Sequence, residues 1–153
     1  MKSANERNLL ITGCAGFIGS HAAEYFIDHG YNVFGVDCLT YAGNTENMRG
    51  FVNNIPVYRH SICETNLIKK IVEKHNIDWI INFAAETHVD NSINSCDPFI
   101  ESNINGVKSL LEVCRDTKTK IFHISTDEVY GVALNEAYTE EANLSPRNPY
   151  SAT

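Results

Sequence analysis

Short apolar runs alternate with longer amphipathic stretches along this chain of 153 residues. The runs lie at 9–11, 31–36, 56–59, 78–83 and 120–125. Runs of this length, bounded by polar turns, are typical of strands that are covered on both faces. Strands that alternate with helices predict an α/β fold with a doubly wound parallel sheet. The natural strand order is 3-2-1-4-5, with a ligand cleft where strands 1 and 4 diverge.

Helical periodicity marks the segments between the strands. In the first predicted helix, a helical period is followed by Ile18, Ala22, Tyr25, Phe26 and His29. Gly30 is predicted to end this helix as its C′ residue. The next buries Ile68, Ile71 and Val72 and turns its lysines to solvent. A short helix is possible from Asn44, and another opens at Tyr150.

A longer helix is predicted to begin at Asp97, with this aspartate as N-cap and Pro98 at the first helical position. Its expected buried stripe is Ile100, Ile104, Val107, Leu111 and Cys114.

Composition narrows the classes of partner. Hydrophobic residues make up 43 % of the chain and charged residues 20 %, as in ordinary globular domains. The formal net charge of −7 argues against nucleic acid or an anionic membrane as the main partner. The polar start shows no signal core, and no apolar run approaches membrane-spanning length.

The five cysteines are scattered, odd in number and contain no C-x-x-C pair. They indicate neither a disulfide framework nor a metal site, and they favour a reducing, cytoplasmic setting.

Three glycines follow the first strand, at positions 13, 16 and 19. Glycine allows a tight turn and a close approach of backbone N–H groups to a ligand, and a helix N-terminus attracts a pyrophosphate. The spacing is G-x-x-G-x-x-G, which departs from the basic dinucleotide fingerprint. A glycine-rich turn without a ligand is the alternative.

Asp37 lies about twenty residues further on, at the tip of the second strand. A carboxylate there accepts both adenosine ribose hydroxyls and repels a 2′-phosphate, which favours NAD over NADP. Taken alone, Asp37 is equally well a solvated acid at a strand end.

Two adjacent carboxylates, Asp127 and Glu128, follow the fifth strand. Such a pair can divide the roles of acid and base, but only if the chain leaves strand geometry at about Thr126. A solvated acidic loop is the alternative. Tyr150 opens the last predicted helix, and a tyrosine there can act as a base toward a sugar hydroxyl if a cation lies near it.

Five segments carry a resemblance to a known family: T-G-C-A-G-F-I-G-S, V-D-C-L-T-Y-A-G-N, A-A-E-T-H-V-D-N-S-I, S-T-D-E-V-Y-G and N-P-Y-S-A-T. They resemble the nucleotide-sugar 4,6-dehydratases, which are extended short-chain dehydrogenase/reductases. The resemblance covers nearly the whole chain and implies a Rossmann-type NAD-binding domain over residues 1–153, corresponding to the N-terminal half of such an enzyme. On this expectation the domain lacks its last strands, and the substrate domain is absent.

The resemblance also implies site residues. Asp127 is implied as general acid, Glu128 as general base and Tyr150 as redox base, with Thr126 and Thr87 bonded to the sugar. The implied cofactor contacts are Gly13, Gly16, Phe17, Ile18 and Gly19 at the pyrophosphate, Asp37, Cys38, Leu39 and Thr40 at the ribose, Ser61 and Ile62 at the adenine, Phe83, Ala84, Ala85, Glu86, Thr87 and Tyr150 on the nicotinamide side, and Ser102 from the following helix.

The implied activity is that of a lyase, which dehydrates a nucleoside-diphosphate glucose to the 4-keto-6-deoxy sugar nucleotide. The favoured substrate is dTDP-glucose. The alternatives are dehydration of UDP-glucose and epimerisation of a sugar nucleotide. Two departures matter. Ser61 replaces the aspartate usual in the family, which predicts weaker NAD binding. The sequence ends one residue before the position of the family lysine, so the 153 residues alone are expected to bind NAD with little turnover. A homodimer is expected, through the helices that start near Pro98 and Tyr150.

Overall fold

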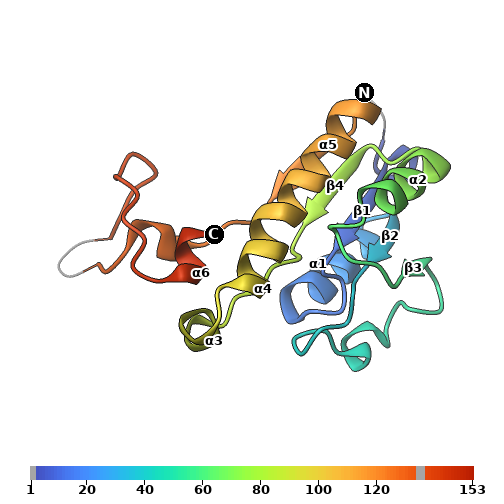
Figure 1. Ribbon diagram of the computed structural model, residues 1–153. Helices are drawn as coiled ribbons and strands as arrows, with labels where there is room; N and C mark the ends of the chain where they lie inside the picture. Colours follow the sequence, from blue (N-terminus) through green and yellow to red (C-terminus); the bar gives the residue numbers. More distant parts are fainter. Residues whose placement is uncertain (1–2, 134–136) are drawn as a thin grey trace.

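The computed structural model describes residues 3–133 and 137–153, so positions 1, 2 and 134–136 of the predicted domain lie outside the described residues. Five parallel strands form one sheet in the order β3-β2-β1-β4-β5, which confirms the predicted order (Figure 1). The strands are β1 (Asn8–Thr12), β2 (Asn32–Val36), β3 (Val57–Tyr58), β4 (Trp79–Asn82) and β5 (Lys120–His123).

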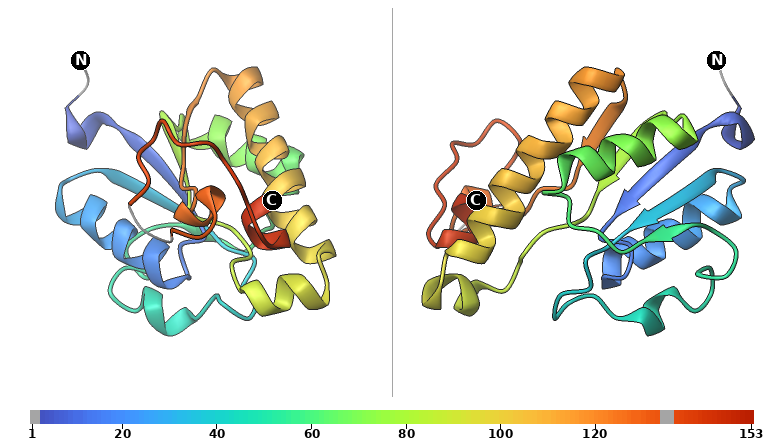
Figure 2. Two further views of the ribbon diagram at one scale, coloured as in Figure 1. Left: turned by 90° about the vertical axis from the view of Figure 1, so that its left-hand side faces the viewer. Right: turned by 45° about the vertical axis from the view of Figure 1, so that its right-hand side comes forward.

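Helices cover both faces of the sheet (Figure 2). On one face, α2 (Thr65–His75) and α5 (Val107–Thr117) pack on alternate strand residues such as Leu10 and Ile80. On the other, α1 (Phe17–Asp28) and the segment around the 3₁₀ turn η2 (Thr45–Met48) pack on Leu9 and Ile11. Because neighbouring residues of β1 and β4 enter opposite cores, these strands read as continuous apolar runs. A further 3₁₀ turn, η1 (Ala4–Glu6), precedes β1.

The first helix forms where its pattern predicts, but a different face packs on the sheet. Ile18 is 63 % exposed and Tyr25 57 % exposed, whereas Gly19, Ser20 and Ala23 are buried. Small side chains let α1 approach β1 closely, so the residues of the predicted period turn partly outward. The predicted stop is confirmed. Gly30 has a φ of 81°, and the N–H of Tyr31 donates to the carbonyl of Phe26 across the helix end.

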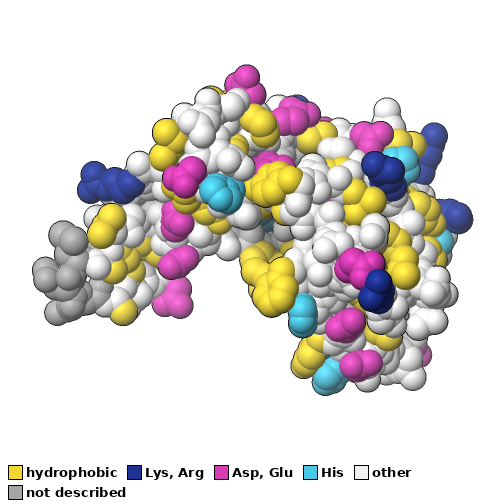
Figure 3. Space-filling view, turned by 90° about the horizontal axis from the view of Figure 1, so that it is seen from below, with side chains coloured by type: hydrophobic (Ala, Val, Ile, Leu, Met, Phe, Trp, Pro, Cys, Tyr) yellow, Lys and Arg dark blue, Asp and Glu magenta, His cyan; other side chains and the backbone are white. Residues whose placement is uncertain are grey.

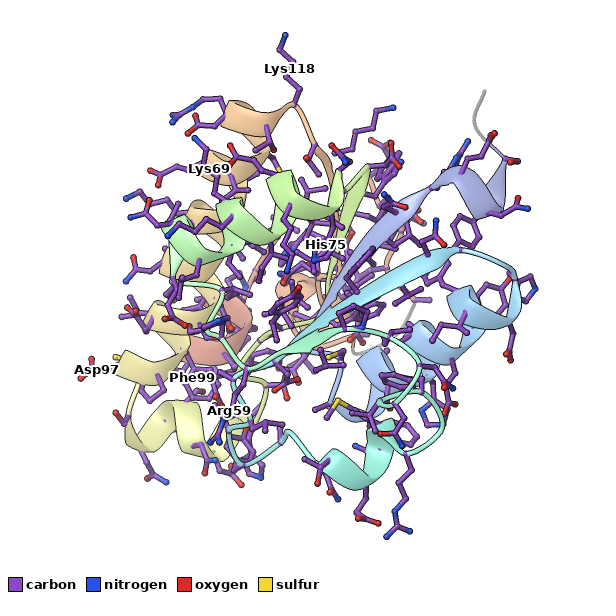
Figure 4. The ribbon with its side chains drawn as sticks, turned by 90° about the vertical axis from the view of Figure 1, so that its right-hand side faces the viewer. Arg59, Lys69, His75, Asp97, Phe99 and Lys118 are labelled. Carbon is purple, nitrogen blue, oxygen red and sulfur yellow. The ribbon has the colours of Figure 1, made fainter. Side chains whose placement is uncertain are left out.

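The predicted long helix is a composite. It consists of α4 (Asp97–Phe99), a π-helical stretch η3 (Ile100–Gly106) and α5, and a short helix, α3 (Val89–Asn94), precedes it. The expected N-cap is wrong by one residue, because the N-cap is Cys96 and Pro98 lies one position later than predicted. Asp97 projects away from the protein instead of capping (Figure 4).

The expected buried stripe is also wrong for most of its members. Ile100, Ile104 and Leu111 are exposed, whereas Phe99, Leu110, Val113 and Cys114 are buried. The π-helical stretch has wider turns than an α-helix, so it shifts the phase of the apolar face between α4 and α5. Cys114 is the member of the stripe that the structure confirms as buried.

The last segment reaches beyond β5 to one side of the sheet (Figure 1). It contains the 3₁₀ turn η4 (Asp127–Tyr130) and α6 (Pro149–Ala152), which confirms the helix opening near Tyr150. The Asn148 side chain caps α6 by accepting the Ser151 N–H at 2.8 Å, and Pro149 occupies the first turn. No helix in the described part of the chain is long and apolar enough to span a membrane.

Candidate active site

A cavity of about 600 Å³ opens at the C-terminal edge of the sheet. It lies between the N-terminus of α1, the loop after β4, the end of β5 and α6. Seen from below, the molecule is hollowed between the segment after β5 and the main body, with hydrophobic side chains beside the hollow (Figure 3). The sequence-predicted residues that line it are Gly13, Gly16, Phe17, Ile18, Gly19, Phe83, Ala84, Ala85, Thr87, Thr126 and Tyr150.

The glycine turn is shaped by close backbone contacts. Gly13 has a φ of 70°, and a Cβ there would lie 2.7 Å from the Ala84 nitrogen on the neighbouring loop. A side chain at Gly19 would collide with the Gly13 carbonyl. Both positions therefore require glycine, and both bring the start of α1 against the ends of β1 and β4. The first α-helical bond runs from the Ser20 N–H to the Gly16 carbonyl, so the N–H groups before it remain at the helix end, where an anion binds.

Asp37 is fixed at the tip of β2. One carboxylate oxygen accepts the Ala15 N–H at 2.9 Å, and the other accepts the Leu39 N–H at 2.8 Å. A carboxylate oxygen accepts more than one hydrogen bond, so Asp37 retains capacity for two ligand hydroxyls. The acid is thus part of the glycine turn and not a solvated strand end.

A smaller cavity of about 80 Å³ continues past Asp37. Predicted residues that line it are Asp37, Cys38, Thr40, Ser61, Ile62, Glu86 and Ser102. Leu39 lines neither cavity; its side chain packs against the core on the α1 side. Burial and the nearby Asp37 carboxylate raise the pKa of the Cys38 thiol.

Ser61 keeps hydrogen-bonding capacity toward this smaller cavity. Its hydroxyl oxygen accepts the Cys63 N–H at 3.2 Å, and its own N–H donates to the Glu64 carboxylate at 2.8 Å. A hydroxyl oxygen has a second lone pair, so Ser61 can still accept a hydrogen bond from an amino group.

Asp127 and Glu128 can enter one site only if the chain leaves strand geometry at about Thr126, and the structure meets this condition. Strand β5 ends at His123 and η4 begins at Asp127, so the chain has left strand geometry before Thr126. The Thr126 hydroxyl caps η4 by accepting the Glu128 N–H at 3.3 Å. Thr126 and Val129 line the large cavity, but Asp127 and Glu128 do not and lie beside it.

Glu128 is tied to the helix that carries Tyr150. Its carboxylate accepts the Asn148 side-chain N–H at 2.9 Å, and Asn148 is the N-cap of α6. The Tyr150 ring packs edge-on against buried Phe99, with ring centroids 6.4 Å apart. The structure therefore brings the acidic turn and the tyrosine to one side of the cavity.

Asn103 is a site residue that sequence reasoning missed. From the π-helical stretch its amide accepts the Glu86 N–H at 2.9 Å and donates to the Glu86 carbonyl at 3.0 Å. It also donates to the Thr153 hydroxyl at 3.1 Å, so it joins the loop after β4 to α6. An asparagine inside a helix is unfavourable by propensity, and this feature of the sequence could have pointed to a special role for Asn103.

A row of polar side chains crosses the sheet beneath the cavity and was also missed. The Thr12 hydroxyl donates to the Asn82 side-chain oxygen, and the Asn82 amide lies 2.9 Å from Nδ1 of His123. Burial lowers the pKa of His123, which favours the neutral ring that can accept this bond. No cluster of metal-ligating side chains occurs among the described residues, and all five cysteines are free.

Comparison with known proteins decides the family. The family model described as GDP-mannose 4,6 dehydratase matches residues 10–153. The chain belongs to the GDP-mannose 4,6 dehydratase family. The chain is 42 % identical to a dTDP-glucose 4,6-dehydratase from Haemophilus influenzae, over 95 % of this chain and 48 % of the relative.

Solved structures show the same fold. The dTDP-glucose 4,6-dehydratase DesIV from Streptomyces venezuelae, crystallised with NAD and TYD, superposes with a TM-score of 0.89 at 36 % identity, over 95 % of this chain and 47 % of that one. A UDP-glucose 4-epimerase from Brucella ovis in complex with NAD superposes with a TM-score of 0.87 at 30 % identity, over 95 % and 44 %. The chain therefore spans about half the length of the relatives that it matches.

Proposed function

We propose that the chain holds NAD for the dehydration of a nucleoside-diphosphate glucose, and that dTDP-glucose is the favoured substrate. The observation that carries this proposal is the acidic turn Asp127–Glu128, tied through Asn148 to the helix of Tyr150 at the edge of the cavity. A glycine turn alone supports only dinucleotide binding. Two carboxylates beside a tyrosine add the groups that removal of water requires.

The residues present fit NAD. The cradle at Gly13 and Gly19 is space that a Cβ would fill, and the N-terminus of α1 suits a pyrophosphate. Asp37 is held so that it can accept two ribose hydroxyls, and Ser61 and Ser102 line the cavity beyond it. When bound, NAD supplies a hydride acceptor that is restored within the same turnover.

The chain's own residues then have distinct roles. Tyr150 accepts the proton of the sugar C4 hydroxyl, and Thr87 and Thr126, which both line the cavity, hold the sugar. Glu128 removes the C5 proton once C4 is a ketone, because the ketone acidifies that position. Asp127 protonates the C6 hydroxyl so that it leaves as water. Loss of water leaves a C5=C6 double bond, and the 4-keto-6-deoxy sugar nucleotide forms when C6 receives the hydride that was taken from C4 and C5 receives a proton.

The test joins these 153 residues to the remaining half of the Haemophilus influenzae relative and supplies dTDP-glucose or UDP-glucose. We expect the alkali-induced absorbance of a 4-keto sugar with at least one substrate. Glu128→Gln and Tyr150→Phe should each lower kcat by about a hundredfold or more, since each removes a proton-transfer group. Tyr25→Phe, an exposed tyrosine on α1, is the matched control and should leave kcat unchanged.

A chimera that binds NAD and yields no 4-keto product with either nucleotide would contradict the dehydratase proposal. For the 153 residues alone we expect NAD binding with severely impaired turnover. Dehydratase activity of these residues alone at the chimera's rate would contradict that expectation.

The epimerase reaction is the second candidate, because the chain is also 30 % identical to an epimerase of the same fold. It would give the 4-epimer without loss of water. The Asp127–Glu128 pair favours the dehydratase, since epimerisation at C4 needs no acid for a leaving C6 hydroxyl.

We also propose that the chain forms a homodimer through α4, η3 and α5. Ile104 is 46 % exposed and Leu111 51 % exposed, and Ile100 is exposed in the same composite helix. A row of exposed apolar residues along one helix is typical of a protein–protein interface. The five free cysteines support a reducing, cytoplasmic setting for this assembly.

A further inference from the structure

The turn between β1 and α1 has little in its own sequence to hold it in one conformation. Three glycines within seven residues give its backbone more conformational freedom than other residues would. Gly16 is the N-cap of α1 and has no side chain that could cap the helix. The N–H groups at the start of α1 suit an anion only while the turn keeps one shape, so hydrogen bonds from elsewhere in the chain are needed to hold it.

Ala15, in the middle of this turn, receives such hydrogen bonds from the segment that follows β2. Its N–H donates to the Asp37 carboxylate at 2.9 Å. Its carbonyl accepts the Asn44 N–H at 3.0 Å and a side-chain N–H of Asn47 at 2.9 Å. A carbonyl oxygen has two lone pairs, so these two donors satisfy it.

The Ala15 carbonyl also fixes the start of α1, because it shares a peptide plane with the Gly16 N–H. That N–H donates to the Gly13 carbonyl at 3.1 Å, and the Gly16 carbonyl accepts the first α-helical bond, from Ser20. A peptide plane turns as one unit, so donors that hold the carbonyl also direct the N–H. The orientation of this one peptide therefore sets how the chain enters α1.

Asn47 is well placed to hold that carbonyl. It lies in η2, where Met48 is buried, and Phe51 is buried just beyond, in the core cluster that also contains Ala15. The Asn47 side chain itself is half-buried. A backbone carbonyl can only accept a hydrogen bond, so the amide nitrogen of Asn47 must be the atom that faces Ala15.

We propose that Asn47 is a positioning residue for the pyrophosphate of the cofactor, since its side chain holds the Ala15 carbonyl and thereby keeps the N–H groups at the start of α1 in place for the anion. This inference rests on the proposed binding of NAD. Asn47 lines neither of the two cavities, so it acts on the cofactor through the glycine turn and not by contact.

The experiment measures the affinity of the chain for NAD by calorimetry. Asn47→Ala removes the donor and should weaken NAD binding about fivefold, as expected when one hydrogen bond is lost. Asn47→Asp keeps the size of the side chain but sets a carboxylate against a carbonyl, so it should weaken binding at least as much.

Asn8→Ala is the matched control, because it removes the same kind of hydrogen bond at the opposite edge of the sheet. The Asn8 side chain, at the start of β1, donates to the His75 carbonyl at 2.7 Å. Both alanine variants should lower the urea unfolding midpoint, but Asn8→Ala should bind NAD like the parent. In hydrogen exchange, the Gly16 N–H should exchange faster in Asn47→Ala than in Asn8→Ala.

Three results would each overturn the positioning role and leave the cofactor proposal intact. They are parent-like NAD affinity in Asn47→Ala, an equal loss of affinity in Asn8→Ala, and equal exchange of the Gly16 N–H in the two variants. A parent chain that binds no NAD overturns both proposals.

Discussion

At the scale of single residues, the positions of the cleft side chains depend on backbone contacts, and the spacing of residues in the sequence predicts only some of these contacts. The requirement for glycine at positions 13 and 19 could be predicted, because a tight strand-to-helix turn imposes it locally. The position of Asp37 could also be predicted from its place after β2. The contact of Asn103 with the loop after β4 could not, because it depends on segments that only the tertiary fold brings together.

Ser61 offers a test of adenine recognition at the residue scale. Replacing it with aspartate supplies a charged acceptor for the adenine amino group, and charge-assisted hydrogen bonds are roughly twice as strong as neutral ones. We therefore expect Ser61→Asp to tighten NAD binding by about fivefold, measured by calorimetry. Ser61→Ala should weaken it. Equal affinity of the parent and both variants would show that this side chain does not reach the adenine.

His75 makes the stability of the fold depend on pH. His75 is the last residue of α2 (Figure 4). Its ring lies tilted by 30° against Phe34 of β2, with ring centroids 4.2 Å apart, and bonds to the Tyr58 hydroxyl at 2.6 Å. Burial, and then the charge of Lys74, lower the pKa of His75 below its usual value of about 6.5. The unfolded chain therefore binds the proton more readily, so this contribution to stability is present above about pH 6.5 and is lost as the pH falls.

Urea unfolding at pH 7.5 and pH 5.5 checks this expectation. The unfolding midpoint should be lower at pH 5.5, and the difference should shrink in His75→Gln. An unchanged difference in that variant would assign the pH dependence to other groups, among which His123 has a pKa shifted in the same direction.

At the scale of elements, the strands and their order could be predicted almost completely. A strand covered on both faces is an uninterrupted apolar run, and the connections leave few topologies open. The composite helix was harder, because the π-helical stretch is not visible in a pattern that assumes a constant period. The stripe of Ile100, Ile104 and Leu111 was correctly recognised as apolar but wrongly expected to be buried.

That exposed stripe predicts the oligomeric state. Leu111→Asp should convert a dimer to a monomer in analytical ultracentrifugation, because it places a charge at the centre of an apolar contact. The comparison variant is Phe122→Asp, on the outermost strand β5, where Phe122 is 57 % exposed. If Phe122→Asp dissociates the dimer and Leu111→Asp does not, association runs through the open edge of the sheet and the helical interface is wrong.

The whole molecule combines a net charge of −7 with a cleft that we propose to receive the pyrophosphate of NAD at the N-terminus of α1. Local N–H donors at the start of α1 resolve this apparent conflict, because they act over a few ångströms whatever the overall charge. The family model matches nearly the whole chain, whereas the chain covers only about half the length of each relative. The central claim is therefore that these 153 residues form a site specific for NAD.

Calorimetric titration of the chain with NAD and with NADP tests that claim most directly. If NAD binds as proposed, the 2′-phosphate of NADP would meet the Asp37 carboxylate, so we expect NAD to bind and NADP to bind at least about tenfold more weakly. Asp37→Ala should bring the two affinities closer together. Absence of NAD binding, or equal affinity of the parent chain for NAD and NADP, would contradict the account.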